Sequence, residues 1–183
     1  MPLAEIAEPW RSFLRQLDEA CQTTIELHCF GGFVVTQCYG LPRLTEDVDV
    51  LQARPPGLSQ QLYNLAGRGS ALHRQHGVYL DLVTIATVPE DYDQRLSEMY
   101  AGSFQHLRLF ALDAYDLALA KLERNIYRDR EDVLYLARTV PFDLALLRER
   151  YEQELRPYLG NPAREDLTLR LWIEAIQEER DCH

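Results

Sequence analysis

Apolar residues recur at helical spacing near both ends of the chain, and short β-prone runs occupy its middle. The spacing predicts an amphipathic helix over residues 9–22 and further helices over 32–39 and 58–66. Continuous apolar or alternating runs predict strands over residues 25–30, 46–52, 77–85 and 106–110. A polar turn is expected over residues 67–76. The first half of the chain is therefore predicted to mix helices and strands.

The pattern beyond residue 112 is helical. Asp113 is placed to begin a helix as its N-cap, and we expect that helix to cover residues 114–127. Two more helices are predicted from apolar residues at helical spacing: Leu144, Leu147, Tyr151 and Leu155 in one, and Leu169, Trp172, Ile173 and Ile176 in the other. We therefore expect an α/β core over residues 1–112 and a helical C-terminal region over 113–183 that packs on the core.

Composition narrows the classes of protein to consider. The 183 residues suffice for one domain with a core, and the net charge of −10 argues against a broad nucleic-acid-binding surface while leaving a local RNA contact open. No apolar run is long enough to span a bilayer, and the first residues lack the basic and apolar regions of a signal peptide. The four cysteines show no spacing typical of zinc sites. We expect a cytoplasmic protein without a membrane partner.

Three acidic residues in predicted strands are the strongest chemical signal. Asp47 and Asp49 alternate with valines, so their side chains share one face of a strand. Adjacent carboxylates repel each other unless a cation lies between them, and Mg²⁺ is a cation that carboxylates bind. Asp81 interrupts another apolar strand, where a lone buried charge is costly. It either faces solvent on an edge strand or joins Asp47 and Asp49 at a shared metal site, and we favour the second interpretation.

Two further features are typical of phosphate binding. Gly31 and Gly32 stand where a strand passes into a helix, and the absence of Cβ atoms there lets phosphate oxygens approach the backbone N–H groups. Eighteen of the nineteen basic residues are arginine, and Lys121 is the single lysine. Its compact ammonium suits one phosphate oxygen or carboxylate, and drift of a single position is the alternative explanation.

These residues together resemble a known superfamily. The ordered set resembles the nucleotidyltransferases that share the DNA polymerase β palm fold: Gly31-Gly32, then Arg43-x-Thr45-x-Asp47-x-Asp49, then Asp81. A later set is similar to the bacterial nucleotidyltransferase-like proteins related to the abortive-infection and type IV toxin families: Asp116 to Lys121-x-x-Arg124, then Arg128-Asp129-x-x-Asp132. The resemblance covers residues 25–138.

The resemblance implies an α+β fold in which a mixed sheet flanked by helices is followed by a helical region. It also implies an enzyme that moves a nucleoside monophosphate from an NTP to a hydroxyl of RNA, such as tRNA, or of protein, and the related families suggest the role of a toxin or stress effector. Two Mg²⁺ ions, or Mn²⁺ in their place, would be bound by Asp47, Asp49 and Asp81, with Asp81 accepting the proton. The implied nucleotide-binding residues are Gly31, Gly32, Arg43, Thr45, Lys121 and Arg124.

The chain departs from the family pattern at one important position. Many active members have serine where this chain has Gly32, and this departure favours an alternative function: a degenerate nucleotide-binding domain or an antitoxin-like protein that binds a cognate partner through its C-terminal helices. Lys121 and Arg124 have an alternative role too, as ion-pair partners of Asp129, Asp132 or Glu123 that join two helices. A metal-dependent phosphohydrolase is disfavoured because no histidine accompanies the acids. The sequence leaves the acceptor and the oligomeric state open.

Overall fold

The structure of the chain, a computed structural model, describes residues 6–182. Residues 1–5, which the search for a signal peptide included, and His183 lie outside that range. The chain separates into two compact units, one formed by Met1–Ile85 with Leu96–Leu112 and the other by Ala86–Arg95 with Asp113–His183. The segment 86–95 therefore groups with the helices that follow residue 112. Within the described residues, no helix is long and apolar enough to cross a bilayer.

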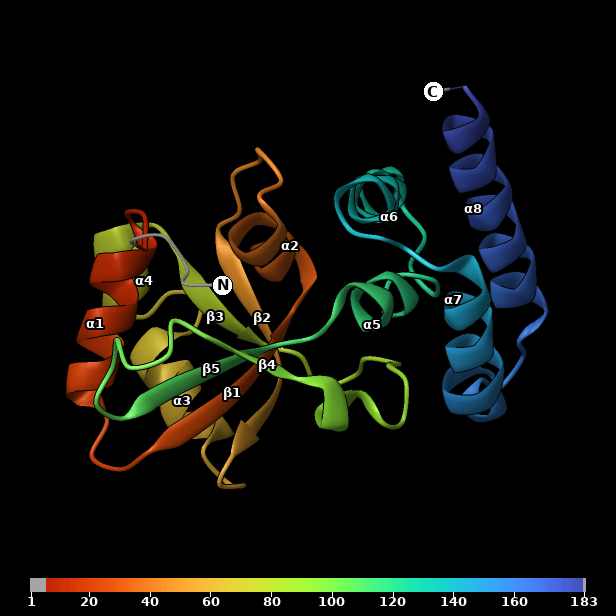
Figure 1. The fold of residues 1–183 in the computed structure, drawn as a ribbon. Helices are drawn as coiled ribbons and strands as arrows, with labels where there is room; N and C mark the ends of the chain where they lie inside the picture. Colours follow the sequence, from red (N-terminus) through yellow and green to blue (C-terminus); the bar gives the residue numbers. More distant parts are fainter. Residues whose placement is uncertain (1–5, 183) are drawn as a thin grey trace. The chain divides into compact units, whose positions relative to one another are not determined.

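The first unit is a five-stranded mixed sheet with helices packed against it (Figure 1). Its strands lie in the order β3-β2-β1-β5-β4; β2 pairs with β3 in parallel and with β1 in antiparallel orientation. The strands are β1 (Ile25–Phe30), β2 (Asp47–Arg54), β3 (Tyr79–Leu82), β4 (Ser97–Met99) and β5 (Leu107–Ala111). The helices are α1 (Trp10–Ala20), α2 (Gly31–Tyr39), α3 (Ser59–Ala66) and α4 (Ala71–His76). This is the mixed α+β architecture that the sequence predicts.

One face of the sheet forms the core of this unit. Leu27 of β1, Val50 of β2, Leu80 of β3 and Leu109 of β5 are buried and belong to this face by strand alternation and register. Large apolar side chains of the surrounding helices are also fully buried: Phe13, Leu14, Leu17, Phe33 and Leu62. The alternate residues of β2 and β3, which include the three acids, point to the opposite face of the sheet.

A carboxylate fixes helix α1 to the loop before β5. Asp18 accepts hydrogen bonds from the backbone N–H groups of Gln105 (2.9 Å), His106 (2.7 Å) and Leu107 (2.7 Å). Burial alone would raise the pKa of Asp18, but these three donors outweigh it and hold the pKa below its ordinary value. The ionised Asp18 side chain thus satisfies three backbone N–H groups at the start of β5.

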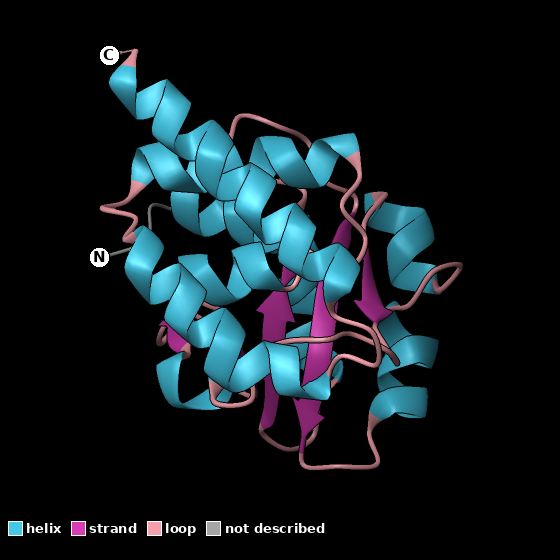
Figure 2. Ribbon diagram, turned by 90° about the vertical axis from the view of Figure 1, so that its right-hand side faces the viewer, coloured by secondary structure: helices cyan, strands magenta, loops and turns pink. Residues whose placement is uncertain are grey.

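The second unit is helical, and strands are absent from its described residues (Figure 2). It contains α5 (Ala114–Leu119), α6 (Tyr127–Thr139), α7 (Leu144–Arg150) and α8 (Ala163–Asp181). A single π-helical turn over Tyr151–Leu155 continues α7, and short 3₁₀ helices cover Tyr92–Arg95 and Arg156–Tyr158. Asp113 is the N-cap of α5, as predicted, and accepts hydrogen bonds from the N–H groups of Tyr115 and Asp116.

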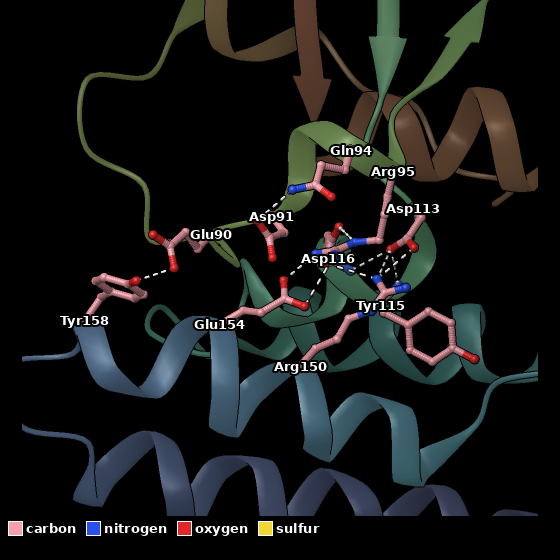
Figure 3. Close-up of polar contacts among 10 residues, drawn as sticks. All are labelled: Glu90, Asp91, Gln94, Arg95, Asp113, Tyr115, Asp116, Arg150, Glu154 and Tyr158. Carbon is pink, nitrogen blue, oxygen red and sulfur yellow. Dashed lines mark hydrogen bonds and ion pairs between the residues drawn. The ribbon is translucent and has the colours of Figure 1, made fainter.

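Ion pairs around a buried carboxylate attach segment 86–95 to this unit (Figure 3). Asp116 is fully buried and accepts two hydrogen bonds of 3.0 Å from the guanidinium of Arg95 and one of 3.1 Å from Arg150. Arg95 also pairs with Glu154, while Arg150 pairs with Asp113. Burial raises the pKa of Asp116 even though both arginines oppose that change. Asp116 is thus a structural residue of the helical unit.

Three predicted elements differ from the observed ones. The helix expected over residues 114–127 ends at Leu119 and gives way to turns over residues 120–124. A new helix starts at Tyr127, after Asn125, which adopts a positive φ of 44° and whose side chain contacts Thr168 and Trp172. The turn expected over residues 67–76 contains helix α4, which Ser70 caps at its start and Gly77 ends in a left-handed conformation. Strand β3 is also shorter than the predicted strand 77–85.

Candidate metal and nucleotide site

The three predicted acids converge on one face of the sheet. Strand register places Asp49 of β2 directly opposite Asp81 of β3, and Asp47 precedes Asp49 by two residues on the same face. One carboxylate oxygen of each lies within 4.8 Å of the others. Asp47 and Asp49 are half-buried and Asp81 is exposed. Among residues 6–182, this is the one group of three acidic, histidine or cysteine side chains with the spacing of a metal site.

Local sequence explains why these carboxylates face away from the core. Val48 and Val50 occupy the alternate positions of β2 and are buried, so the strand cannot turn over without exposing them. Three negative charges at this spacing repel one another by about 1 kcal/mol per pair in water and by about 4 kcal/mol at the dielectric typical of a protein surface. The all-oxygen donor set and this repulsion both fit a hard divalent cation.

The glycine turn lies against the middle acid. Phe30, the last residue of β1, is opposite Asp49, and Gly31 follows it with a positive φ of 70°. A Cβ atom added to Gly31 would lie 1.9 Å from Oδ2 of Asp49. Real Cβ atoms do not come that close to another heavy atom, so glycine is needed here for both its backbone conformation and its small size.

The second glycine lies beside two polar side chains from the loop before β2. A Cβ atom added to Gly32 would lie 3.5 Å from Nη2 of Arg43 and 3.6 Å from Oγ1 of Thr45, which are ordinary contact distances. The Thr45 hydroxyl donates to Oδ1 of Asp47 at 3.0 Å. The structure thus brings together Gly31, Gly32, Arg43 and Thr45 with the acids, and the Thr45 hydroxyl lies beside Gly32.

Two residues that sequence patterns did not single out also belong to this face. Tyr79 is the register partner of Asp47, and the guanidinium of Arg68 lies 5.4 Å from the centre of the Tyr79 ring. Burial and the negative charges of Asp47, Asp81 and Asp49 raise the pKa of Tyr79, while Arg68 acts in the opposite direction. The sequence feature that could have drawn attention to Arg68 is its surroundings, because the segment 50–80 contains no acidic residue.

Lys121 and Arg124 lie in the helical unit, where both pair with acids. Lys121 is buried, with its ammonium 2.8 Å from Oδ2 of Asp132 and 3.5 Å from Oδ1 of Asp129. Arg124 makes two hydrogen bonds to Asp129, of 2.9 Å and 2.6 Å. Burial alone would raise the pKa of Asp129, but Arg124 and Lys121 together lower it. These contacts are those of the alternative role, in which Lys121 and Arg124 join two helices through ion pairs. Nucleotide contact by Lys121 and Arg124 stays a prediction.

Comparison with known proteins gives one match. The sequence model of a family described as "Nucleotidyltransferase of unknown function (DUF6036)" matches residues 11–180. Searches of curated proteins and of solved structures gave no significant match. The matched region contains the acids of β2 and β3, the glycine turn and the helical unit up to residue 180.

Proposed function

Because the chain belongs to this family of nucleotidyltransferases of unknown function, we propose that Asp47, Asp49 and Asp81 bind two Mg²⁺ ions and an NTP. The protein then transfers the nucleoside monophosphate of that NTP to a hydroxyl group of an acceptor. The observation that carries this proposal is the convergence of three carboxylate oxygens within 4.8 Å on two neighbouring strands. In two-metal phosphoryl-transfer sites the ions lie about 3.5–4 Å apart, and carboxylates this close together suit such a pair of ions.

The reaction exchanges one bond to phosphorus for another. The acceptor hydroxyl oxygen attacks the α-phosphorus, the bond from that phosphorus to the bridging oxygen breaks, and pyrophosphate leaves with the bonding electrons. Asp81, the most exposed of the three acids, accepts the hydroxyl proton. When bound, the ions supply positive charge that stabilises the phosphate oxygens and the attacking oxygen. The remaining task of the protein is to align the two reactants.

The glycine turn and the loop before β2 are assigned to the triphosphate. Without side chains at Gly31 and Gly32, phosphate oxygens can approach the backbone at the start of α2, a helix of nine residues. Arg43 supplies a guanidinium beside this turn, which suits phosphate oxygens. Thr45 positions Asp47 through its hydrogen bond. Proximity of Arg43 and Thr45 to Gly32 supports an active site in spite of the missing serine.

The acceptor and the biological role extend the proposal further. We assign the acceptor hydroxyl to RNA, such as a tRNA, or to protein, and the role to a toxin or stress effector, following the resemblance to bacterial nucleotidyltransferases of that kind. Mn²⁺ is expected to replace Mg²⁺, because the donors are all oxygen atoms. Lys121 and Arg124 are assigned primarily to the helical unit, where their ion pairs are observed.

Transfer of label from NTPs tests the proposal. Purified protein is incubated with Mg²⁺, each α-³²P-labelled NTP in turn, and either total RNA or a protein lysate, and labelled products are separated by electrophoresis. Asp49→Asn removes one charge of the cluster with little change of shape. Glu46→Gln is the matched control, since Glu46 is an exposed acid next to the cluster and outside it.

We expect labelled product with the unmodified protein and with Glu46→Gln, and none with Asp49→Asn. Transfer that survives Asp49→Asn would refute the assigned site. Absence of transfer with every NTP and acceptor fraction, together with retained NTP binding, would favour the alternative of a degenerate nucleotide-binding domain.

A further inference from the structure

The segment between the second and third acids has an unusual charge. Acidic residues make up 29 of the 183 residues, yet none occurs in residues 50–80, between Asp49 and Asp81. The same segment contains three arginines and two histidines. In a chain with a net charge of −10, these arginines have no acidic neighbour within their own segment, which favours contact with a polyanion.

Arg68 is the arginine of this segment that lies beside the acids. An isolated bridge pairs Gly67 with Leu80, so the backbone before Arg68 is fixed next to strand β3. A Cβ atom on Gly67 would lie 2.6 Å from the carbonyl oxygen of Tyr63, so glycine is needed where the chain leaves helix α3. The Arg68 side chain is exposed and makes no ion pair with any residue of the range 6–182.

The partner of Arg68 is an aromatic ring. The guanidinium lies 5.4 Å from the centre of the Tyr79 ring, and the His73 ring meets the same tyrosine edge to face at 5.0 Å. Tyr79 precedes Asp81 by two residues on the same face of the strand. A guanidinium held over a tyrosine forms the kind of surface on which nucleic-acid bases stack and to which phosphates bind.

The order of the strands separates two sides of the site. The glycine turn follows β1, and Tyr79 lies on β3, so the turn and the Arg68–Tyr79 pair flank strand β2 from opposite sides. In an in-line transfer, the attacking and leaving oxygens also lie on opposite sides of the phosphorus. A triphosphate at the glycine turn therefore leaves the β3 side for the acceptor.

We propose that Arg68 and Tyr79 bind the 3′ end of a single-stranded nucleic acid as the acceptor. This inference rests on the function proposed above and narrows its acceptor to a polynucleotide. Arg68 pairs with the phosphodiester that precedes the terminal nucleotide, and Tyr79, with the Arg68 guanidinium over it, provides the stacking surface for a base. The terminal hydroxyl then reaches Asp81.

Equilibrium binding of short oligonucleotides tests this site without requiring catalysis. The probes are 5′-fluorescein pentanucleotides of one sequence, as RNA and as DNA, and binding is followed by fluorescence anisotropy in Mg²⁺ at several salt concentrations. The variants are Arg68→Gln, Tyr79→Leu and Tyr79→Phe. Arg54→Gln is the control, because Arg54 belongs to the same acid-free segment but ends strand β2, about 23 Å along the strand from Asp47.

We expect Arg68→Gln to weaken oligonucleotide binding about tenfold and to reduce the salt slope of the affinity by about 0.7, the loss of one phosphate contact on a single strand. Tyr79→Leu should weaken binding, whereas Tyr79→Phe and Arg54→Gln should retain it. The affinity for Mg²⁺-ATP should be unchanged in Arg68→Gln. Tighter binding of the RNA than of the DNA would identify an RNA acceptor. Equal binding would mean that the protein recognises the base and phosphodiester common to both.

Three outcomes would overturn the inference. These are absence of oligonucleotide binding by the unmodified protein, an unchanged affinity and salt slope in Arg68→Gln, or an equal loss in Arg54→Gln. A protein acceptor would appear as the first of these. Failure of the unmodified protein to bind any Mg²⁺-NTP would instead contradict the proposed function, so the two failures are distinguishable.

Discussion

Gly31 and Asp49 are so close that no side chain fits between them. A Cβ atom on Gly31 would lie 1.9 Å from Oδ2 of Asp49, and the backbone φ of 70° at this position is one that residues with a Cβ atom rarely adopt. The turn proposed for the phosphates and the central acid proposed for the metals are therefore fixed against each other. A change at either residue is expected to disturb both functions.

Gly31→Ala tests this coupling. We expect the free energy of unfolding to fall by about 2–4 kcal/mol, from the left-handed conformation and from the forced shift of Asp49, and Mg²⁺-NTP affinity to fall at least about tenfold. Gly77→Ala is the control, because Gly77 has a similar φ of 74° and open space around it. It should cost about 1–2 kcal/mol and leave the affinity intact. Urea denaturation and calorimetric titration measure both quantities, and equal affinities in the two variants would disprove the coupling.

Gly32→Ser should be tolerated. The added Cβ atom makes only ordinary contacts with Arg43 and Thr45, and serine is a better helix former than glycine. We expect an unchanged or slightly raised melting temperature and an NTP affinity at least equal to that of the unmodified protein. A marked fall in either quantity would mean that Gly32 is required by packing or by the ligand, and that Thr45 does not stand in for the family serine.

Lys121→Met should strongly destabilise the helical unit. Removing a buried ammonium leaves the carboxylates of Asp129 and Asp132 buried without it, which costs about 3–5 kcal/mol. Arg138→Gln is the comparison, since its ion pair with Glu179 is largely exposed and should contribute at most about 1 kcal/mol. Denaturant unfolding of the two variants gives the difference. If Lys121→Met is as stable as Arg138→Gln but binds NTP weakly, Lys121 is a nucleotide ligand and not a structural residue.

Asp18 should make stability depend on acid pH. The pKa of Asp18 is lower in the folded than in the unfolded chain, so the folded chain binds fewer protons. The stabilisation by Asp18 is therefore complete above the unfolded pKa of about 3.9 and is lost as the pH falls through the folded pKa. Asp18→Asn should lose about 1–3 kcal/mol at neutral pH and show a flatter dependence below pH of about 4. Parallel pH dependences of the unfolding free energy in the two proteins would contradict this role.

Local pattern was enough to predict much of the first unit. The strand over residues 25–30, the glycine turn, and the shared face of Asp47 and Asp49 all follow from alternation and from the conformational freedom of glycine. The meeting of Asp81 with these acids could only be a hypothesis, because strand register is a long-range property. The structure supplies that register by pairing Asp49 with Asp81.

The differences between predicted and observed elements have physical reasons, some local and some in tertiary contacts. Nothing between residues 114 and 127 is a glycine or proline, so the pattern extends one helix where the structure has two, and Asn125 was the available signal for a left-handed residue. Helix α4 has local signals of its own, the N-cap Ser70 and the terminating Gly77, within a stretch whose polar composition predicts a turn. Strand β4 has no β-prone pattern and forms through its pairing with β5. Sequence patterns do not identify Arg68 as a site residue, because it belongs to no motif and only the absence of acids in residues 50–80 sets its surroundings apart.

The central claim is that Asp47, Asp49 and Asp81 form a divalent-metal and nucleotide site, and anomalous diffraction tests it most directly. Crystals are grown with Mn²⁺ and a non-hydrolysable NTP analogue, and data are collected at the manganese edge. We predict anomalous peaks in contact with the three carboxylates and the triphosphate along the turn at Gly31 and Gly32. A nucleotide bound elsewhere, or no manganese at these carboxylates in crystals that hold the analogue, would contradict the account.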